Sequence, residues 1–289
     1  LFAKKSNENV EGKSEKTIYK KLGLEFIPPE LRENRGELKA AENKKIPELV
    51  ELDDLKGDLH IHTKFSEGKY SLDKMVNAAQ ELDYEYIAIT DHSQSQKIAN
   101  GMDIDTLKQQ WDAIDKISNK YKIKILKGAE VDILPDGTLD YPDDVLKKLD
   151  IVIGSVHSRF KSSKKEMTER IIAALNNKHL DILGHPTGRL IGKRERYQAD
   201  FDKIFETAGD NNKILEINSQ PKRLDLNDES ILHAKKFNVK FCINTDSHDI
   251  SHLDFMKYGI GQAKRGWLTR EDIINTYSYS KLKDFLGNS

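Results

Sequence analysis

Seven short apolar segments, each bounded by polar or turn residues, alternate with helix-forming stretches along most of this chain. The intervening stretches carry apolar residues at helical spacing, as at Leu107, Trp111 and Ile114. Parallel strands need crossover connections, so strands that alternate with helices indicate a parallel α/β arrangement. The pattern by itself allows a closed barrel or a doubly wound sheet. The segments are 58–61, 86–90, 123–131, 151–156, 181–184, 214–218 and 239–244.

The composition of the chain limits the cellular compartment and the class of protein that we expect. The 289 residues include one cysteine, Cys242, so no disulfide can form within the chain, and its apolar run indicates a core position rather than a nucleophile. No apolar run approaches the roughly 20 residues of a membrane span, and residues 1–21 are too polar for a signal peptide. We therefore expect a cytoplasmic protein that does not contact a membrane. The net charge of −1 gives no overall indication of nucleic-acid binding.

The first 54 residues differ from the rest of the chain. A short helix over 14–21 is the most that the spacing predicts, and Pro28 and Pro29 end any continuation. Residues 30–56 are charged and have few apolar anchors, so this segment should bury too little to fold alone. We expect a lead-in over 1–54 that packs against another part of the protein or belongs to a larger domain, and a main domain over 55–289.

Histidines and carboxylates follow six of the seven predicted strands. His60 and His62 end the first strand as H-x-H, which places both imidazoles on one face. The others are His92, Glu130, His157, His185, Asp246 and His248. In a parallel barrel the carboxyl ends of the strands converge on one face, where active sites lie. This set exceeds what one four-coordinate ion needs, so it predicts two or three divalent metals, such as Zn²⁺ or Mn²⁺. His179, His233 and His252 are interpreted as ordinary surface or core residues.

Basic residues cluster in three loops that follow the predicted strands. Arg159–Lys165 follows the fourth strand, Arg189–Arg196 the fifth, and Lys222 and Arg223 the sixth. Guanidinium and ammonium groups are the usual protein ligands of phosphate. Loops of this kind around a metal face predict a phosphate-bearing substrate and metal-assisted phosphoester hydrolysis. Neither a P-loop nor a G-x-G-x-x-G motif occurs, which disfavours nucleotide binding through those motifs.

Six motifs in this sequence resemble those of the PHP (polymerase and histidinol phosphatase) family. They are Gly57–Thr63, Ile89–Ser93, Gly128–Glu130, Gly154–Ser158, Gly184–Leu190 and Asn244–His248. Within the family, the chain looks most like the C-terminal PHP domain of bacterial and archaeal X-family DNA polymerases. Residues 18–19, 22–24 and 27–32 resemble the end of the polymerase thumb and the linker after it. The resemblance implies a distorted (β/α)₇, TIM-like barrel over 55–289, a thumb and linker over 1–54, and a polymerase domain upstream in the parent chain.

The resemblance also implies a site with three metal ions. One ion would take His60, His62, Glu130 and Asp246; a second, Glu130, His157 and His185; and a third, Glu67, His92 and His248. The family usually has Asp at the place of Glu67, so this carboxylate lies about one methylene further out. Mn²⁺ or Zn²⁺ is expected, with Mg²⁺ or Fe²⁺ as alternatives. The predicted catalytic residues are Glu130, Asp246, His157 and His248, and the predicted substrate contacts are Arg159, Arg189, Lys222 and Arg223.

The activity that the resemblance implies is a 3′–5′ exonuclease or 3′-end processing step in DNA repair, carried out by a cytoplasmic, nucleoid-associated enzyme on DNA 3′ ends. The sequence does not choose between diester and monoester substrates. Three alternatives stay open: a small-molecule phosphatase of the histidinol-phosphatase type, a scaffold domain that metals only stabilise, and an amidohydrolase. An amidohydrolase often has a ligating Lys where this chain has His157. The thumb-like lead-in favours the DNA enzyme over a free-standing phosphatase.

Overall fold

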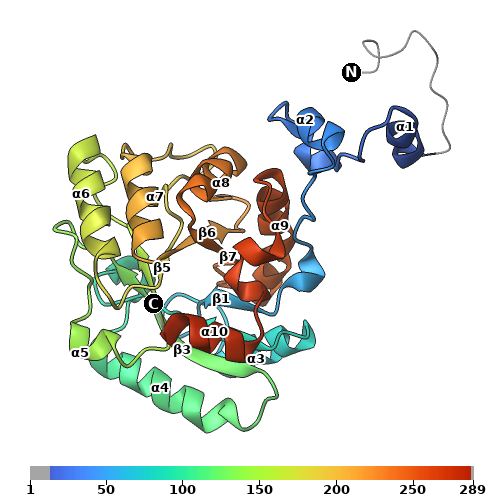
Figure 1. Ribbon diagram of the computed structural model, residues 1–289. Coiled ribbons are helices and arrows are strands. Elements are labelled where there is room, and N and C mark those ends of the chain that lie inside the picture. Colours follow the sequence, from blue (N-terminus) through green and yellow to red (C-terminus); the bar gives the residue numbers. More distant parts are fainter. Residues whose placement is uncertain (1–13, 288–289) are drawn as a thin grey trace.

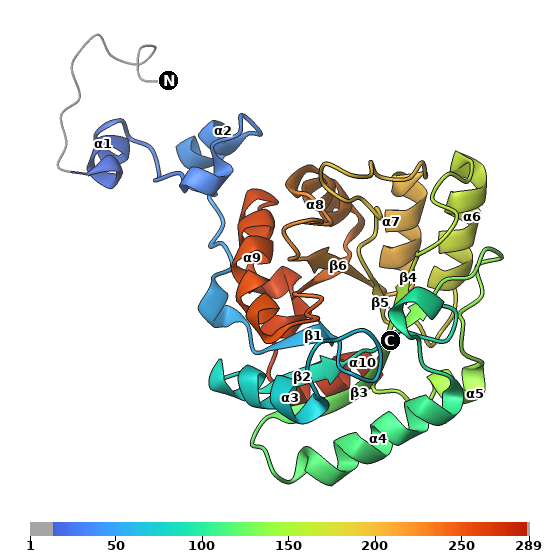
Figure 2. The same cartoon turned by 180° about the vertical axis from the view of Figure 1, so that it is seen from behind.

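The computed structural model, which describes residues 14–287, contains a seven-stranded parallel sheet in the order β1 to β7 (Figures 1 and 2). The strands are β1 (Gly57–Ile61), β2 (Tyr86–Ile89), β3 (Lys124–Asp132), β4 (Ile151–Ser155), β5 (Ile182–Leu183), β6 (Ile214–Asn218) and β7 (Lys240–Asn244). The end of β7 returns to β1, where Ile61 bridges to Ser247 and the His62 N–H donates to the Ser247 carbonyl at 2.8 Å. The sheet is therefore a nearly closed barrel, which confirms the predicted barrel and rules out the doubly wound sheet.

Helices connect the strands and surround the barrel (Figure 1). They are α3 (Leu72–Glu81), α4 (Ile104–Ser118), α5 (Asp143–Leu146), α6 (Lys164–Leu175), α7 (Phe201–Asp210), α8 (Asp228–Ala234) and α9 (Met256–Arg265). The helical stripe predicted from the sequence is the buried face of α4, where Leu107 and Ile114 have 0–1% exposure. Ser163 and Glu166 form a capping box that fixes the start of α6 directly after the β4 loop.

Apolar side chains fill the barrel interior. Leu59, Ala88, Leu126, Ile153 and Cys242 belong to one buried cluster, so the cysteine lies in the core as expected. The same cluster includes Leu282 of α10 (Tyr279–Gly287). The segment before α10 contacts the first residues of the strands, since Asn275 Nδ2 donates to the Gly57 carbonyl at 2.9 Å. The C-terminal segment therefore closes the amino end of the barrel and leaves the carboxyl end open for a site.

The lead-in packs against the barrel beside α9 (Figures 1 and 2). It contains α1 (Glu15–Lys21) and α2 (Glu37–Glu42), of which α1 matches the short helix expected from the sequence. Ile27, Leu31 and Ala41 are fully buried in a small cluster with Trp267 of the barrel domain. The apolar anchors of the lead-in therefore pack together and against one tryptophan of the barrel domain. The position of the domain boundary at residue 54 stays a prediction.

Across residues 14–287, the protein contains no helix with the length and apolar character that a bilayer crossing requires.

Candidate metal centre

The barrel brings all nine predicted ligands to the carboxyl ends of its strands. His60 and Glu130 lie within β1 and β3, and the others lie in the loops that follow β1, β2, β4, β5 and β7. Two of these loop residues have left-handed backbone conformations, with φ of 25° at His185 and 52° at Asp246. Such conformations are uncommon for residues with a Cβ and occur often at functional sites. The parallel strands thus achieve the convergence that the sequence pattern predicted.

The group His60, His62, Glu130 and Asp246 is buried, and ligand atoms from all four lie within 4.8 Å of one another. His60 Nε2 lies 3.3 Å from Glu130 Oε2, and His62 Nε2 lies 3.1 Å from Asp246 Oδ1. This is the ligand set expected for the first ion. The H-x-H spacing on β1 explains why both imidazoles point to the same carboxylates.

Glu130 lies between two groups of imidazoles. Its Oε1 is 2.9 Å from His185 Nε2 and 3.2 Å from His157 Nε2. Its Oε2 faces His60 at 3.3 Å and His92 Nδ1 at 2.9 Å. With one oxygen toward each group, this carboxylate has the geometry needed to bridge two ions.

Glu67 reaches the outer histidines despite being Glu where the family usually has Asp. Its Oε1 lies 3.0 Å from His248 Nε2 and 3.3 Å from His92 Nε2. The side chain of Glu67 is 40% exposed, whereas that of Glu130 is 1% exposed. One difference from the sequence assignment concerns His92, which faces Glu130 with one nitrogen and Glu67 with the other. His92 can therefore serve either the outer ion or an inner one.

Two carboxylates that the sequence reasoning missed hold the histidines from behind. Glu216 Oε1 lies 2.7 Å from His60 Nδ1, and Asp132 Oδ1 lies 2.5 Å from His157 Nδ1. Metal-binding imidazoles usually donate their second N–H to such an acceptor, which fixes the ring and its tautomer. A carboxylate in the middle of an otherwise apolar strand, such as Glu216 in β6, was the feature of the sequence that could have indicated these supporting residues.

The unpaired atoms of the cluster show that its residues fit divalent cations. His60 Nε2, His92 Nδ1 and Glu130 Oε2 are buried and lie close to one another, but none of them has a partner in hydrogen-bond geometry within residues 14–287. Buried polar atoms nearly always have a partner, and ions at this place would supply one. Imidazole nitrogens and carboxylate oxygens without a thiolate suit Zn²⁺, Mn²⁺ or Fe²⁺. The cluster thus has the chemistry of a metal centre with several ions.

The pKa shifts within the cluster also indicate a site for divalent cations. Burial acts to lower the pKa of His92, but the carboxylates of Glu130, Glu67 and Asp246 together outweigh burial and raise this pKa to about 10. Burial also acts to lower the pKa of His60, but the carboxylates of Glu216, Glu130 and Asp246 together outweigh it, so this pKa lies well above its usual value. The pKa of Glu130 lies well below its usual value, because His92, His157 and His60 outweigh its burial. Protons therefore occupy this centre in the absence of metal, and cations would displace them.

The predicted substrate contacts divide into two kinds. Arg223 lies beside the cluster, with Nε 3.7 Å from Asp246 Oδ2, and its NH1 is buried without a described hydrogen-bond partner. Arg189 instead donates from Nε to the Arg223 carbonyl at 2.7 Å and from NH2 to the Leu224 carbonyl, so it supports the loop that carries Arg223. Arg159 and Lys222 are exposed at the rim.

The two lysines at the start of α6 have acidic neighbours. Lys164 Nζ lies 3.4 Å from Asp200 Oδ2, and Lys165 Nζ lies 3.8 Å from Glu169 Oε1. These surface ion pairs partly offset the two charges, which the sequence analysis had counted among the phosphate-binding residues. His252, which the sequence analysis set aside, lies next to the cluster and accepts from the His248 N–H at 3.3 Å.

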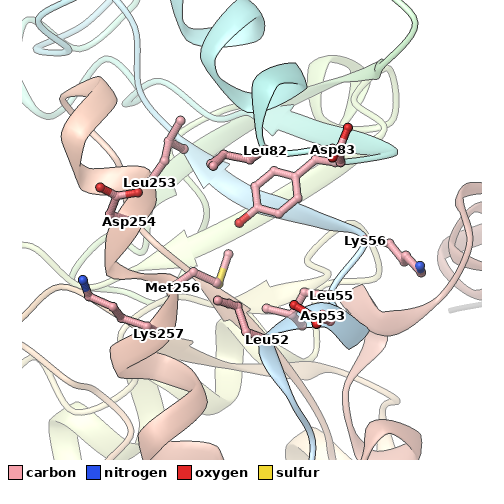
Figure 3. A pocket seen from close by; sticks show the side chains of 11 residues that line it. Leu52, Asp53, Leu55, Lys56, Leu82, Asp83, Leu253, Asp254, Met256 and Lys257 are labelled. Atoms are coloured by element: carbon pink, nitrogen blue, oxygen red, sulfur yellow. The ribbon is translucent and has the colours of Figure 1, made fainter.

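A separate cavity of about 600 Å³ lies on the side wall of the barrel (Figure 3). Leu52 of the lead-in and Leu55 just before β1 line one side, the end of α3 contributes Leu82, and the segment around the start of α9 contributes Leu253 and Met256. None of its lining residues belongs to the metal cluster, so it is not part of this site.

A parallel barrel that carries histidines and carboxylates at the carboxyl ends of its strands defines a metal-dependent hydrolase of the barrel class. The sequence matches the PHP domain model over residues 58–220 and the DNA polymerase beta thumb model over residues 1–33. The chain belongs to the PHP family and is a metal-dependent phosphoesterase of that family.

The chain is similar to two kinds of curated protein, a DNA polymerase with exonuclease activity and a probable phosphatase. The chain is 46% identical over 274 residues to the DNA polymerase/3′-5′ exonuclease PolX of Bacillus subtilis, which covers 94% of the chain and 48% of that protein. The chain thus spans about half the length of this relative. It is 30% identical over 241 residues to a probable phosphatase of Thermoanaerobacter pseudethanolicus, which covers 79% of the chain and 93% of that protein.

Two solved structures share the fold. A Listeria monocytogenes protein assigned as a histidinol phosphatase has a TM-score of 0.53 and 19% identity, and the match covers 68% of this chain and 97% of that one. The histidinol phosphate phosphatase of Lactococcus lactis, solved with zinc, L-histidinol and phosphate, has a TM-score of 0.50 and 20% identity, covering 72% and 93%. At these identities the likeness concerns the fold.

Proposed function

We propose that this chain hydrolyses phosphoesters at DNA 3′ ends, as the 3′–5′ exonuclease or 3′-end processing domain of an X-family DNA polymerase in DNA repair. The observation that carries the proposal is the spread of exposed basic residues around the metal centre. They are Lys64, Lys97, Arg159, Lys161, Lys193 and Lys222, on the loops after β1, β2, β4, β5 and β6. No ion pair is described for any of them within residues 14–287. Such a ring extends beyond what a single phosphate group needs, and it fits a strand with several phosphates.

We propose that the residues of the centre bind three metal ions. We assign His60, His62, Glu130 and Asp246 to one ion, Glu130, His157 and His185 to a second, and Glu67, His92 and His248 to a third. When bound, Mn²⁺ or Zn²⁺, with Mg²⁺ or Fe²⁺ as alternatives, would lower the pKa of a water and neutralise phosphate oxygens. Glu216 and Asp132 contact the Nδ1 atoms of His60 and His157, and would thereby leave the Nε2 atoms of these imidazoles free to hold the ions.

The basic residues at the centre and its rim would bind the substrate. Arg223 has an unpaired, buried NH1 beside Asp246, which suits a non-bridging oxygen of the reacting phosphate. Arg189 holds the loop that presents Arg223. Arg159 and Lys222 are exposed and would bind phosphates further along the strand.

A small-molecule phosphatase is the second candidate. It is favoured by the probable phosphatase of Thermoanaerobacter pseudethanolicus, because 93% of that protein aligns with this chain. The match of residues 1–33 to a polymerase thumb model argues for the DNA enzyme instead, since a free-standing phosphatase has no need of a thumb.

Turnover of three substrates by the metal-loaded chain decides between these functions. The substrates are a 3′-labelled oligonucleotide, histidinol phosphate and a small chromogenic phosphodiester, each with Mn²⁺ and with a chelator. We expect metal-dependent release of nucleotides from the 3′ end, which His157→Ala abolishes. Faster hydrolysis of histidinol phosphate than of DNA would establish the second candidate, and ions bound without turnover of any substrate would indicate a scaffold.

A further inference from the structure

Asp91, the residue between β2 and His92, is fully buried, and its carboxylate is saturated with hydrogen bonds. Oδ1 accepts from the Thr63 N–H at 2.7 Å and from the Ser66 hydroxyl at 2.6 Å. Oδ2 accepts from the Thr63 hydroxyl at 2.6 Å and from Gln110 Nε2 at 2.7 Å. An ionised carboxylate offers about four acceptor positions, and four donors use them. Asp91 therefore has no capacity left for a metal, although it adjoins a predicted ligand.

Three of these four donors come from the loop that carries Glu67. Within that loop the Thr63 carbonyl accepts from the Ser66 N–H at 3.1 Å and from the Gly68 N–H at 2.9 Å. A Cβ at Gly68 would lie 2.6 Å from the Thr63 backbone, so the turn is closed tightly around its own start. The turn fixes the Cα of Glu67, and Asp91 fixes the turn.

Glu67 needs this support more than the inner ligands do. Its side chain is 40% exposed, so burial does not hold it, and its carboxylate contacts His92 and His248. We infer that Asp91 is the positioning residue of the outer metal position: it ties the Glu67 loop to the end of β2, and thereby holds Glu67 at a set distance from His92. This inference rests on the outer ion of the proposed function.

The test is a metal titration of the full chain with Mn²⁺, with bound ions counted by elemental analysis and affinities measured against a chelating indicator. Asp91→Asn leaves one acceptor oxygen for four donors. We expect the outer ion to bind about 10- to 100-fold more weakly while the two inner ions stay bound. Gln110→Met is the matched control, because it removes the one donor that comes from α4 rather than from the loop, and it should leave all three affinities unchanged.

Hydrogen exchange of the metal-free protein supplies a readout that needs neither metal nor substrate. Amides of residues 63–68 should exchange faster in Asp91→Asn than in the wild type, and at the wild-type rate in Gln110→Met. If Asp91→Asn does not fold, Ser66→Ala removes a single loop-to-Asp91 bond and should still weaken the outer ion.

Wild-type affinity for the outer ion and wild-type exchange in Asp91→Asn would overturn the inference. Equal effects of Asp91→Asn and Gln110→Met would also overturn it, because they would show a general packing role. A wild-type chain that binds only two ions would refute the outer metal position of the proposed function, and the exchange experiment would still decide whether Asp91 holds the loop.

Discussion

Glu216 Oε1 lies 2.7 Å from His60 Nδ1, so the imidazole of His60 is held between one carboxylate behind it and Glu130 in front. Glu216 also accepts from the His185 N–H at 2.7 Å. One buried side chain on β6 thus orients a proposed ligand from β1 and positions the backbone of a proposed ligand after β5. The two inner metal positions that we propose share this support.

Replacing Glu216 with Gln should therefore weaken both inner ions. The amide keeps the size of the side chain but loses the charge that favours the Nδ1–H tautomer of His60. We expect about a 10- to 100-fold loss of affinity, measured by competition with a chelating indicator. Glu206→Gln, an exposed glutamate on α7, is the control. Equal affinities in the two variants would show that the charge behind His60 does not matter.

Glu67 gives a second prediction, about side-chain length. Glu67→Asp should keep or raise turnover, since the shorter side chain is the one usual in the family, whereas Glu67→Ala should reduce turnover sharply. The measurement is the initial rate on a 3′-labelled oligonucleotide at saturating Mn²⁺. Equal rates for the wild type and Glu67→Ala would show that the outer ion is dispensable.

Metal binding should release protons. Against the effect of burial, neighbouring carboxylates, Glu130 foremost, raise the pKa of His92 to about 10, and carboxylates also raise the pKa of His60, His157 and His248. The raised pKa keeps the His92 imidazole charged in the metal-free protein at pH 7, and the upward shifts favour the charged form of the other three, but only neutral imidazole binds an ion. Their ion pairs stabilise the metal-free fold most below the unfolded His pKa of about 6.5, and this contribution is lost as the pH rises through the folded values.

Calorimetric titration with Mn²⁺ in buffers of different ionisation enthalpy measures this release. We expect about two or more protons per chain at pH 7, and an affinity that rises with pH. Activity should fall as the pH drops through roughly 6, where protons compete best. A heat of binding independent of the buffer would contradict the electrostatics of the cluster.

Asp181 provides a test of stability away from the metal centre. Burial at the start of β5 raises the pKa of this carboxyl to about 7, and its Oδ2 accepts from the Val152 N–H at 2.7 Å. Between pH ~4 and ~7 the folded state binds a proton that the unfolded state has lost, so stability falls as the pH rises, by at most about 1.4 kcal/mol per unit.

Asp181→Asn should remove this contribution while keeping an acceptor for Val152. The free energy of unfolding of the metal-free protein, measured with urea from pH 4.5 to 8, should decline less steeply in the variant than in the wild type. Parallel profiles would show that Asp181 stays ionised in the fold.

Much of the architecture was predictable, because buried strands in a parallel barrel are short and strongly apolar. The run at 214–218 is β6 itself, and the run at 86–90 exceeds β2 by one residue. The strand-end rule also predicted that the proposed ligands would converge, since parallel strands end on one face. The contact between the lead-in and the barrel could not be predicted from the sequence, because Trp267 lies far from Ile27 in sequence and only the folded chain brings them together.

The supporting residues of the site could not be read from the sequence for a physical reason. Glu216 and Asp91 act through hydrogen bonds to residues far along the chain, at sequence separations of 156 for His60 and 28 for Thr63. Arg189 looked like a phosphate contact, but a charged residue in a loop does not reveal whether it faces solvent or, as here, a backbone carbonyl.

The final prediction concerns the exposed lysines that should distinguish DNA from a small phosphoester. Lys161 and Lys193 are exposed on the loops after β4 and β5, and neither has a described ion pair within residues 14–287. Each phosphate contact with a single strand adds about 0.7 to the slope of log affinity against log salt. Reversing both charges, with Lys161→Glu and Lys193→Glu, should weaken oligonucleotide binding and lower this slope by about 1.4. Hydrolysis of a small chromogenic phosphodiester should stay close to the wild-type rate, because neither side chain is among the proposed ligands.

Lys147→Glu with Lys148→Glu is the matched control, since these exposed lysines precede β4 at the opposite end of the barrel and should leave the slope unchanged. Equal losses with both substrates would mean that the loops shape the metal centre, and a slope near zero in the wild type would remove the case for a bound strand.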